Sequence, residues 1–215
     1  MEIKWQKSPN YRAGANRRIL AIVDHITAGL MPGCLSWMCY PASKASAHYL
    51  VCKDGTIYQL VADTDIAWHA GVVHRPSWTL YDGTNPNRYT IGIEHECLSG
   101  GELTEEQYQS TLWLHKELVR KHKIPIDRQH IIGHYEIDSV NRPNCPGAQF
   151  PWARLMADLQ ASKQSADSLT VSVHGYEEQV PVVKRGETNY IPIRWLGRLG
   201  YKVEWDGDKV IITYK

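Results

Sequence analysis

Residues 18–25, RILAIVDH, give the clearest indication of the fold class, because an unbroken apolar run ends there in two polar residues. The run is short, continuous and rich in β-branched residues, which is typical of a strand buried on both faces of a sheet. Two later stretches have the same form. Residues 89–93 lead into Glu94, and residues 129–133 lead into His134, just as residues 18–23 lead into His25.

Between these strands the sequence predicts a hairpin and two helices. Residues 48–52 and 56–61 are strand-like and flank a Lys-Asp-Gly turn. Thr104, followed by Gln107, has the capping pattern that starts a helix, and apolar residues at helical spacing extend it to about His122. Residues 150–160 form the second helix. We therefore expect residues 1–160 to fold as an α/β domain with a mixed central sheet flanked by helices.

The last quarter of the chain has a different organisation. The polar stretch 161–168 predicts a linker. Beyond it, alternating apolar residues predict two hairpins separated by a short helix. Residues 169–215 are therefore expected to form a small α+β module.

Composition excludes several classes of function. The 215 residues contain 24 Lys and Arg against 23 Asp and Glu. The net charge of +1 therefore lacks the excess of basic residues that is typical of nucleic-acid-binding proteins. The apolar runs fall far short of the roughly 20 residues that span a bilayer, which argues against membrane insertion. The first ten residues lack an apolar signal segment, so we expect synthesis in the cytoplasm without a signal peptide. The odd number of cysteines argues against a disulfide framework, although pairing of Cys34 with Cys39 stays open.

The polar residues at the strand ends suggest a metal site. If the three strands are parallel neighbours, His25, Glu94 and His134 meet at the carboxyl edge of the sheet, where ligands gather in α/β proteins. Cys145 follows His134 by eleven residues, and a loop of that length can return to the same edge. Two imidazoles and a thiolate suit Zn²⁺ with a fourth position open to water. Taken singly, each residue has a simpler alternative, a hydrogen-bonded histidine or a packed thiol.

Motifs in the first 150 residues resemble a known family. They are IVDH (22–25), SAHYLV (46–51), AWHAG (67–71), IGIE (91–94), GHYEI (133–137) and CPG (145–147). In this order they resemble the type 2 N-acetylmuramoyl-L-alanine amidases, the zinc amidases of phage endolysins and bacterial autolysins, which are related to peptidoglycan recognition proteins. The resemblance covers roughly residues 15–157.

The resemblance implies a role for each strand-end residue. His25 and His134 match the two zinc histidines, and Cys145 matches the third ligand before Pro-Gly. Glu94 matches the general base of the family. The implied cofactor is Zn²⁺, and the implied reaction is hydrolysis of the amide between N-acetylmuramic acid and L-alanine of the stem peptide by a zinc-activated water.

The same resemblance implies substrate contacts and shows two departures. His69 matches a position that lines the cleft, and we expect it and Trp68 to bind substrate. Ala47 stands where some members have a catalytic tyrosine. Pro143 stands where many members have a lysine that stabilises the oxyanion, and we expect Arg142 to supply that charge. The alternative for Arg142 is a solvated loop residue.

Residues 169–215 resemble the small repeat at the N-terminus of copper amine oxidases, which also occurs in wall-associated enzymes. The likeness is carried by YIPIRWL (190–196), LGYKV (199–203), WDG (205–207) and VII (210–212). It implies a cell-wall-binding domain. A stabilising or dimerising appendage is the alternative.

The sequence therefore predicts an endolysin-type peptidoglycan hydrolase. We expect it to act on the cell wall of a Gram-positive bacterium after release from the cytoplasm. We expect a monomer, with dimerisation through residues 169–215 left open. The alternatives are a non-catalytic peptidoglycan recognition protein, an autolysin or prophage lysin of the same chemistry, and a Cys–His peptidase. The last is disfavoured because Cys145 precedes Pro-Gly rather than a helix.

Overall fold

The computed structural model describes residues 1–14, 18–166, 168–173, 176–181, 183–185, 188–190, 193–197, 200–206 and 209–214. It divides into two compact units, Met1–Leu159 and Gln160–Lys215. The first unit carries every residue that the sequence assigns to the site.

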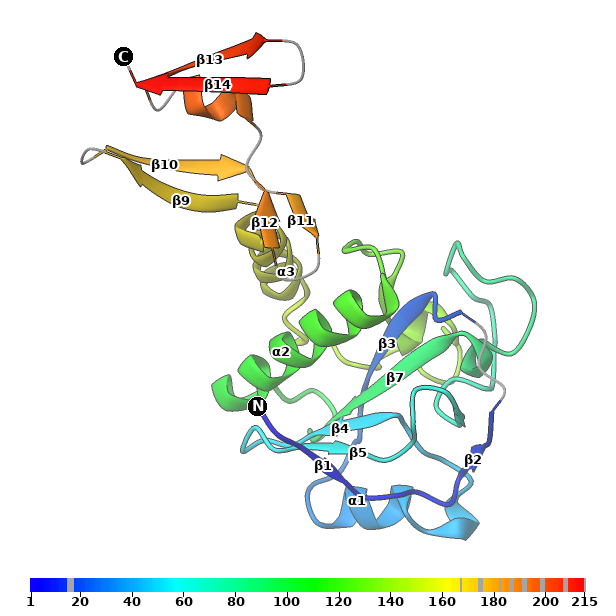
Figure 1. Cartoon of the computed structure of the whole chain (residues 1–215). Helices are drawn as coiled ribbons and strands as arrows, with labels where there is room; N and C mark the ends of the chain where they lie inside the picture. The colour runs from blue at the N-terminus through cyan, green and yellow to red at the C-terminus, as the bar shows by residue number, and fades with distance from the viewer. Residues whose placement is uncertain are drawn as a thin grey trace. The chain divides into compact units, whose positions relative to one another are not determined.

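A six-stranded sheet forms the centre of the first unit (Figure 1). Its strands, in spatial order, are β1 (Ile3–Trp5), β5 (Ile57–Gln59), β4 (Tyr49–Val51), β7 (Thr90–His95), β3 (Ala21–Ile26) and β8 (Ile131–Gly133). Neighbouring strands are parallel except for the β4–β5 hairpin. The mixed central sheet predicted from the sequence is thus confirmed, and β3 lies between β7 and β8 as the strand-end argument requires. A short pair, β2 (Tyr11–Arg12) with β6 (Ile66–Ala67), lies outside this sheet.

Two long helices cover one face of the sheet. Helix α2 (Glu105–His122) begins where the Thr104 hydroxyl accepts a hydrogen bond from the Gln107 amide at 3.1 Å, as the capping pattern predicts. The Gln107 side chain does not complete a capping box. It donates instead to the carbonyls of Val51 and Glu96, which ties the helix to the sheet. Helix α3 (Trp152–Ala166) packs beside α2 through Leu155 and Leu159.

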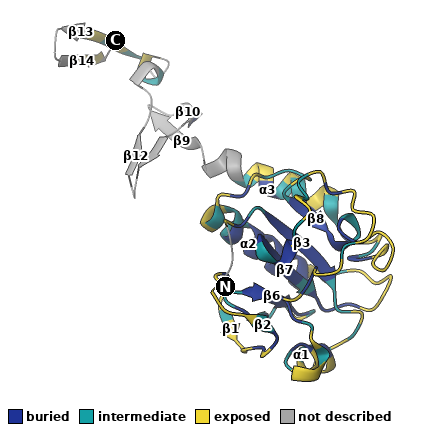
Figure 2. Cartoon of the chain, turned by 90° about the vertical axis from the view of Figure 1, so that its right-hand side faces the viewer, coloured by how far each residue is buried: buried dark blue, intermediate teal, exposed yellow. Residues whose placement is uncertain are grey.

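The sheet separates two sets of side chains, and its central strands are buried (Figure 2). On the helix face, the apolar side chains of β3, β4 and β7 pack against Leu114 and Leu118 of α2. On the opposite face, Val23 and Leu50 contact loops and the short helix α1 (Gly33–Met38). Because side chains alternate along a strand, His25 shares this second face with Val23, away from α2.

Two predicted segments differ in the structure. The stretch 161–168, expected as a linker, is helical as far as Ala166, because residues 161–166 contain neither glycine nor proline to end α3. Residues 29–46, for which the sequence predicts no helix, include α1 and the turn η1 (Pro41–Ser43). Helix α1 has no side-chain cap and is held by burial of Cys34 and Met38 against the sheet. Cys34 and Cys39 are free thiols.

The second unit consists of short antiparallel pairs. They are β9 (Ser168–Val173) with β10 (Tyr176–Pro181), β11 (Val183–Arg185) with β12 (Thr188–Tyr190), and β13 (Tyr201–Asp206) with β14 (Lys209–Tyr214), and the turn η4 (Ile193–Gly197) precedes β13. The β11–β12 pair is additional to the predicted hairpins. Across the described part of both units, we find no helix with the length and apolarity needed to cross a bilayer.

A buried charged pair joins the helix face of β3 to α2. Asp24 Oδ2 lies 3.2 Å from His115 Nε2, and both side chains are inaccessible to solvent. His115 Nδ1 donates to the Thr111 carbonyl at 2.8 Å, so donation to Asp24 requires a proton on both ring nitrogens. Burial disfavours that cation, but the charge and hydrogen bond of Asp24 outweigh burial and raise the pKa of His115. The pair therefore holds β3 against α2 as an ion pair.

Replacing His115 with leucine should lower the free energy of unfolding by about 3 kcal/mol near pH 6, because Asp24 stays buried without its partner. The raised pKa fixes the sign of the pH dependence. The stabilisation is complete below the ordinary histidine pKa of about 6.5 and is lost as the pH rises through the raised value. Urea unfolding at several pH values measures this, with the exposed change Gln109→Leu on the same helix as control. If the loss in free energy of unfolding caused by His115→Leu grew as the pH rises, the result would contradict the ion pair.

Candidate metal and catalytic site

The site lies where the central parallel strands end. In the register of β3 and β7, His25 is opposite Glu94, so both side chains project from the same face. In the register of β3 and β8, Asp24 is opposite Gly133, and His134 follows at the first residue of the turn η3 (His134–Glu136). The structure therefore brings together the three strand-end residues that the sequence predicts to converge.

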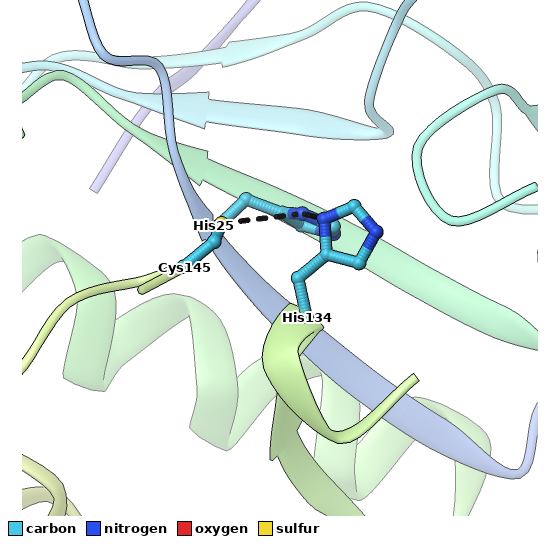
Figure 3. Close-up of side chains that lie close together, drawn as sticks. All are labelled: His25, His134 and Cys145. Carbon is cyan, nitrogen blue, oxygen red and sulfur yellow. Dashed lines mark hydrogen bonds between the residues drawn. The ribbon is translucent and has the colours of Figure 1, made fainter. Parts of the chain in front are cut away.

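Cys145 joins the two histidines in a compact cluster (Figure 3). His25 Nδ1 lies 2.9 Å from His134 Nδ1, and Cys145 Sγ lies 3.9 Å from His25 Nδ1. One ligand atom from each residue falls within 4.8 Å of the others. His25, His134 and Cys145 are 1%, 7% and 8% exposed, so the donor atoms face one another inside the protein.

A close approach at Gly133 lets Cys145 reach the histidines. The Tyr135 amide donates to the Cys145 carbonyl at 3.0 Å, which holds the two loops together. A Cβ at Gly133 would lie 2.6 Å from the Tyr135 ring and 2.8 Å from Pro146. No other residue fits there unless the Cys145 loop moves, since real Cβ atoms do not approach other atoms so closely.

The cluster is neutral when no cation is bound. Burial, and then the charges of His134 and His69, hold the pKa of His25 well below its usual range. Burial and the charge of Arg142 lower the pKa of His134 to about 4. Burial and the charge of Glu94 raise the pKa of the Cys145 thiol to about 12. Two neutral imidazoles and a thiol that can release its proton form a donor set for a divalent cation.

Glu94 lies beside this cluster with a carboxylate that can exchange protons near neutrality. Its Oε2 atom is buried and has no hydrogen-bond partner among the described residues. Burial raises its pKa to about 7, and the charge of Arg142 opposes that rise. An unpaired buried carboxylate oxygen needs a partner that the surrounding side chains do not supply, such as a water or a substrate N–H.

Arg142 is exposed and lies close enough to influence the whole site. Its charge lowers the pKa of His25, His134, Glu94 and Cys145. Its Nη1 atom donates to the Asn141 carbonyl at 3.0 Å, which leaves other guanidinium N–H groups available to a bound molecule.

The two residues expected to bind substrate differ in accessibility. Trp68 is 37% exposed, and its amide is fixed by the Ser46 hydroxyl at 2.9 Å. His69 is 8% exposed, and both of its ring nitrogens contact protein groups, His25 on one side and Thr90 on the other. Sequence reasoning did not single out Thr90, which looks like an ordinary residue at the start of a strand.

Comparison with known proteins shows the family to which the sequence is similar. The sequence profile of the Amidase_2 family, described as N-acetylmuramoyl-L-alanine amidase, matches residues 15–148. N-acetylmuramoyl-L-alanine amidase A of Achromobacter lyticus is 29% identical over 166 residues, which are 68% of this chain and 85% of that protein. The 1,6-anhydro-N-acetylmuramyl-L-alanine amidase AmpD of Citrobacter freundii is 35% identical over 115 residues, 53% of this chain and 57% of that protein.

Solved structures show the same fold. A selenomethionine derivative of AmpD aligns with a TM-score of 0.56 and 28% identity over 73% of this chain and 94% of its own. AmiD of Escherichia coli, in complex with anhydro-N-acetylmuramic acid-L-Ala-D-gamma-Glu-L-Lys, aligns with a TM-score of 0.57 and 27% identity. The alignment covers 68% of this chain and 59% of the AmiD chain. The endolysin amidase LysCS of Clostridium intestinale aligns with a TM-score of 0.52 and 20% identity over 74% of this chain and 95% of its own. At this identity the similarity shows the fold alone.

Proposed function

This chain belongs to the N-acetylmuramoyl-L-alanine amidase family, whose profile matches well over half of it, and on that premise we propose that it is a zinc-dependent peptidoglycan amidase. The observation that carries the proposal is the buried His25, His134 and Cys145 cluster beside the unpaired carboxylate of Glu94. The bond cleaved is the amide between N-acetylmuramic acid and L-alanine of the stem peptide.

The residues present suit zinc rather than a harder cation. Two imidazole nitrogens and one thiolate are borderline-soft donors that Zn²⁺ prefers, whereas Mg²⁺ and Ca²⁺ take oxygen ligands. Three protein ligands also leave a fourth position open, which is the pattern of catalytic rather than structural zinc sites. In this proposal His25 and His134 hold the ion with the Cys145 thiolate. The bound ion supplies Lewis acidity, which polarises an amide carbonyl and lowers the pKa of a nearby water.

The protein side chains then move the protons. Glu94, with a pKa near 7, accepts a proton from the attacking water and delivers it to the leaving L-alanine nitrogen. The buried cluster keeps bulk water away from His25 and His134, which strengthens electrostatic effects at the reacting carbonyl. Arg142 offers its positive charge to the oxygen on which negative charge develops. The exposed ring of Trp68 contacts the sugar or peptide.

The cellular setting belongs to the same proposal. We infer an endolysin-type role on the wall of a Gram-positive bacterium, reached after release from the cytoplasm. The endolysin neighbours share the fold, and the AmpD relatives bear names that specify 1,6-anhydro-N-acetylmuramyl-L-alanine. Assays should therefore offer both intact peptidoglycan and anhydromuropeptides. Preference for the anhydro substrate would move the role from wall lysis to processing of wall fragments.

Glu94→Gln should lower kcat by about 10²- to 10⁴-fold, because the amide cannot accept the water proton, and should leave the bound zinc unchanged. Mass spectrometry of purified peptidoglycan digested by the wild-type protein should show stem peptides with a free L-alanine amine. These peptides should be lost with Glu94→Gln or when a chelator is added, and they should remain with the control Glu102→Gln, whose side chain is exposed. New muramic acid reducing ends would reject the amidase. Wall binding without any released peptide would favour a recognition protein.

Arg142→Ala should lower kcat on a soluble muropeptide by about 10²-fold, in the range seen when a donor to a developing oxyanion is removed. Arg142→Lys should recover part of the loss, because the charge remains while the fork of donors is gone. Arg120→Ala serves as control, since its side chain is 75% exposed on α2. An unchanged kcat in Arg142→Ala would identify Arg142 as a solvated loop residue.

For the second unit we propose a wall-binding role, supported by its resemblance to repeats of wall-associated enzymes and by the compact unit that it forms on its own. The near-zero net charge makes bulk attraction to an anionic wall ineffective, so binding has to come from a specific surface.

Shortening the chain to residues 1–166 should leave kcat on a soluble muropeptide unchanged and reduce co-sedimentation with intact walls. The first unit contains the whole candidate site and its own core, which is why soluble turnover should survive. Equal sedimentation of both forms would favour a stabilising appendage, and a concentration-dependent mass for the full chain alone would favour a dimerising one.

A further inference from the structure

His69 sits behind the metal site as one member of a hydrogen-bonded chain. His25 Nε2 lies 3.0 Å from His69 Nδ1, and His69 Nε2 lies 3.2 Å from the Thr90 hydroxyl. The Thr90 hydroxyl lies 2.8 Å from the Pro86 carbonyl. This series of hydrogen bonds runs from the Pro86 carbonyl to the His25 ring, and its member Thr90 is fully buried.

Counting protons along the chain fixes its direction. The Pro86 carbonyl can only accept, so Thr90 donates its single hydroxyl proton there. His69 Nε2 must then be the donor to Thr90, which leaves the lone pair of a neutral His69 on Nδ1. That lone pair accepts from His25 Nε2. A neutral His25 with its proton on Nε2 carries its own lone pair on Nδ1, the atom 2.9 Å from His134 Nδ1.

The surroundings hold the His69 ring in this place. A Cβ at Gly92 would lie 2.4 Å from the ring, so the imidazole lies directly against the backbone of β7. The ring of His48 packs edge-on at 5.6 Å between centroids, and its own Nδ1 accepts from the Gly92 amide. The amides of His69 and Ala70 both donate to Asn87 Oδ1, at 3.2 and 2.7 Å. These contacts leave the ring little freedom to rotate.

We propose that His69, oriented by Thr90, is a positioning residue that fixes His25 in the tautomer whose Nδ1 lone pair faces the cation. This inference rests on the proposed zinc site and replaces substrate contact as the role of His69, because both ring nitrogens are already engaged within the protein. Outer partners of metal-bound histidines orient the ring and raise its basicity, and their loss typically costs about 10- to 100-fold in metal affinity.

Zinc affinity of the full-length chain, measured by competition with a chromophoric chelator, tests the chain of bonds. Thr90→Val keeps the shape but has no hydroxyl, and His69→Phe keeps a ring but has no acceptor. We expect both to bind zinc about 10- to 100-fold more weakly than wild type, and Thr90→Ser to bind as wild type does. Rescue by serine separates hydrogen bonding from packing, because serine loses the methyl group and keeps the hydroxyl.

The tautomer itself supplies a readout that folding defects do not imitate. In the zinc-free full chain labelled with ¹⁵N-histidine, long-range ¹H–¹⁵N spectra should show His25 protonated on Nε2, and His69→Phe should remove that preference. Wild-type affinity in both Thr90→Val and His69→Phe, or a His25 proton on Nδ1 in wild type, would overturn the positioning role. Zinc-dependent release of L-alanine-led peptides would in that case still stand, whereas a wild-type chain that binds no zinc would overturn the proposed function as well.

Discussion

The parallel pairing of β3 with β7 and β8 is the constraint on which the site depends. Its register places His25 opposite Glu94 and Asp24 opposite Gly133, so the strand ends bring Glu94, His25 and His134 to one edge of the sheet. Because side chains alternate along a strand, a slip of one residue would turn His25 toward α2 and Asp24 toward the opposite face of the sheet. The same alternation places Asp24 on one face of β3 and His25 on the other. Asp24 contacts the buried His115, and His25 contacts the buried His69.

Both faces of β3 therefore contribute to one arrangement. On the helix face, Asp24 is paired with His115, and His95 Nδ1 donates to the His25 carbonyl at 2.8 Å. On the opposite face, His69 Nδ1 lies 3.0 Å from Nε2 of the His25 ring. The backbone and the ring of His25 are thus fixed from opposite sides of the sheet. A ligand held this way loses little conformational entropy when a cation binds, since most of the ordering is complete in the folded chain.

The sequence predicted the parts of this arrangement that depend on local pattern. Apolar runs that end in His25, Glu94 and His134 predict both the strands and their shared edge, and a Cys145 loop of suitable length completes the donor set. Helix α1 was not predicted, because tertiary burial of Cys34 and Met38 holds it rather than caps or propensity. The hydrogen bonds of His69 also lie beyond local pattern, because they depend on how a loop crosses the backbone of a distant strand.

X-ray absorption at the zinc edge of the full-length protein identifies the atoms that bind the metal. We expect one zinc per chain, with one sulfur ligand at about 2.3 Å and nitrogen or oxygen ligands at about 2.0–2.1 Å. Cys145→Ser should remove the sulfur shell, while Cys34→Ser should leave it intact. A zinc shell without sulfur in the wild-type protein, or a sulfur shell that survives Cys145→Ser, would contradict the cluster of His25, His134 and Cys145 as the metal site.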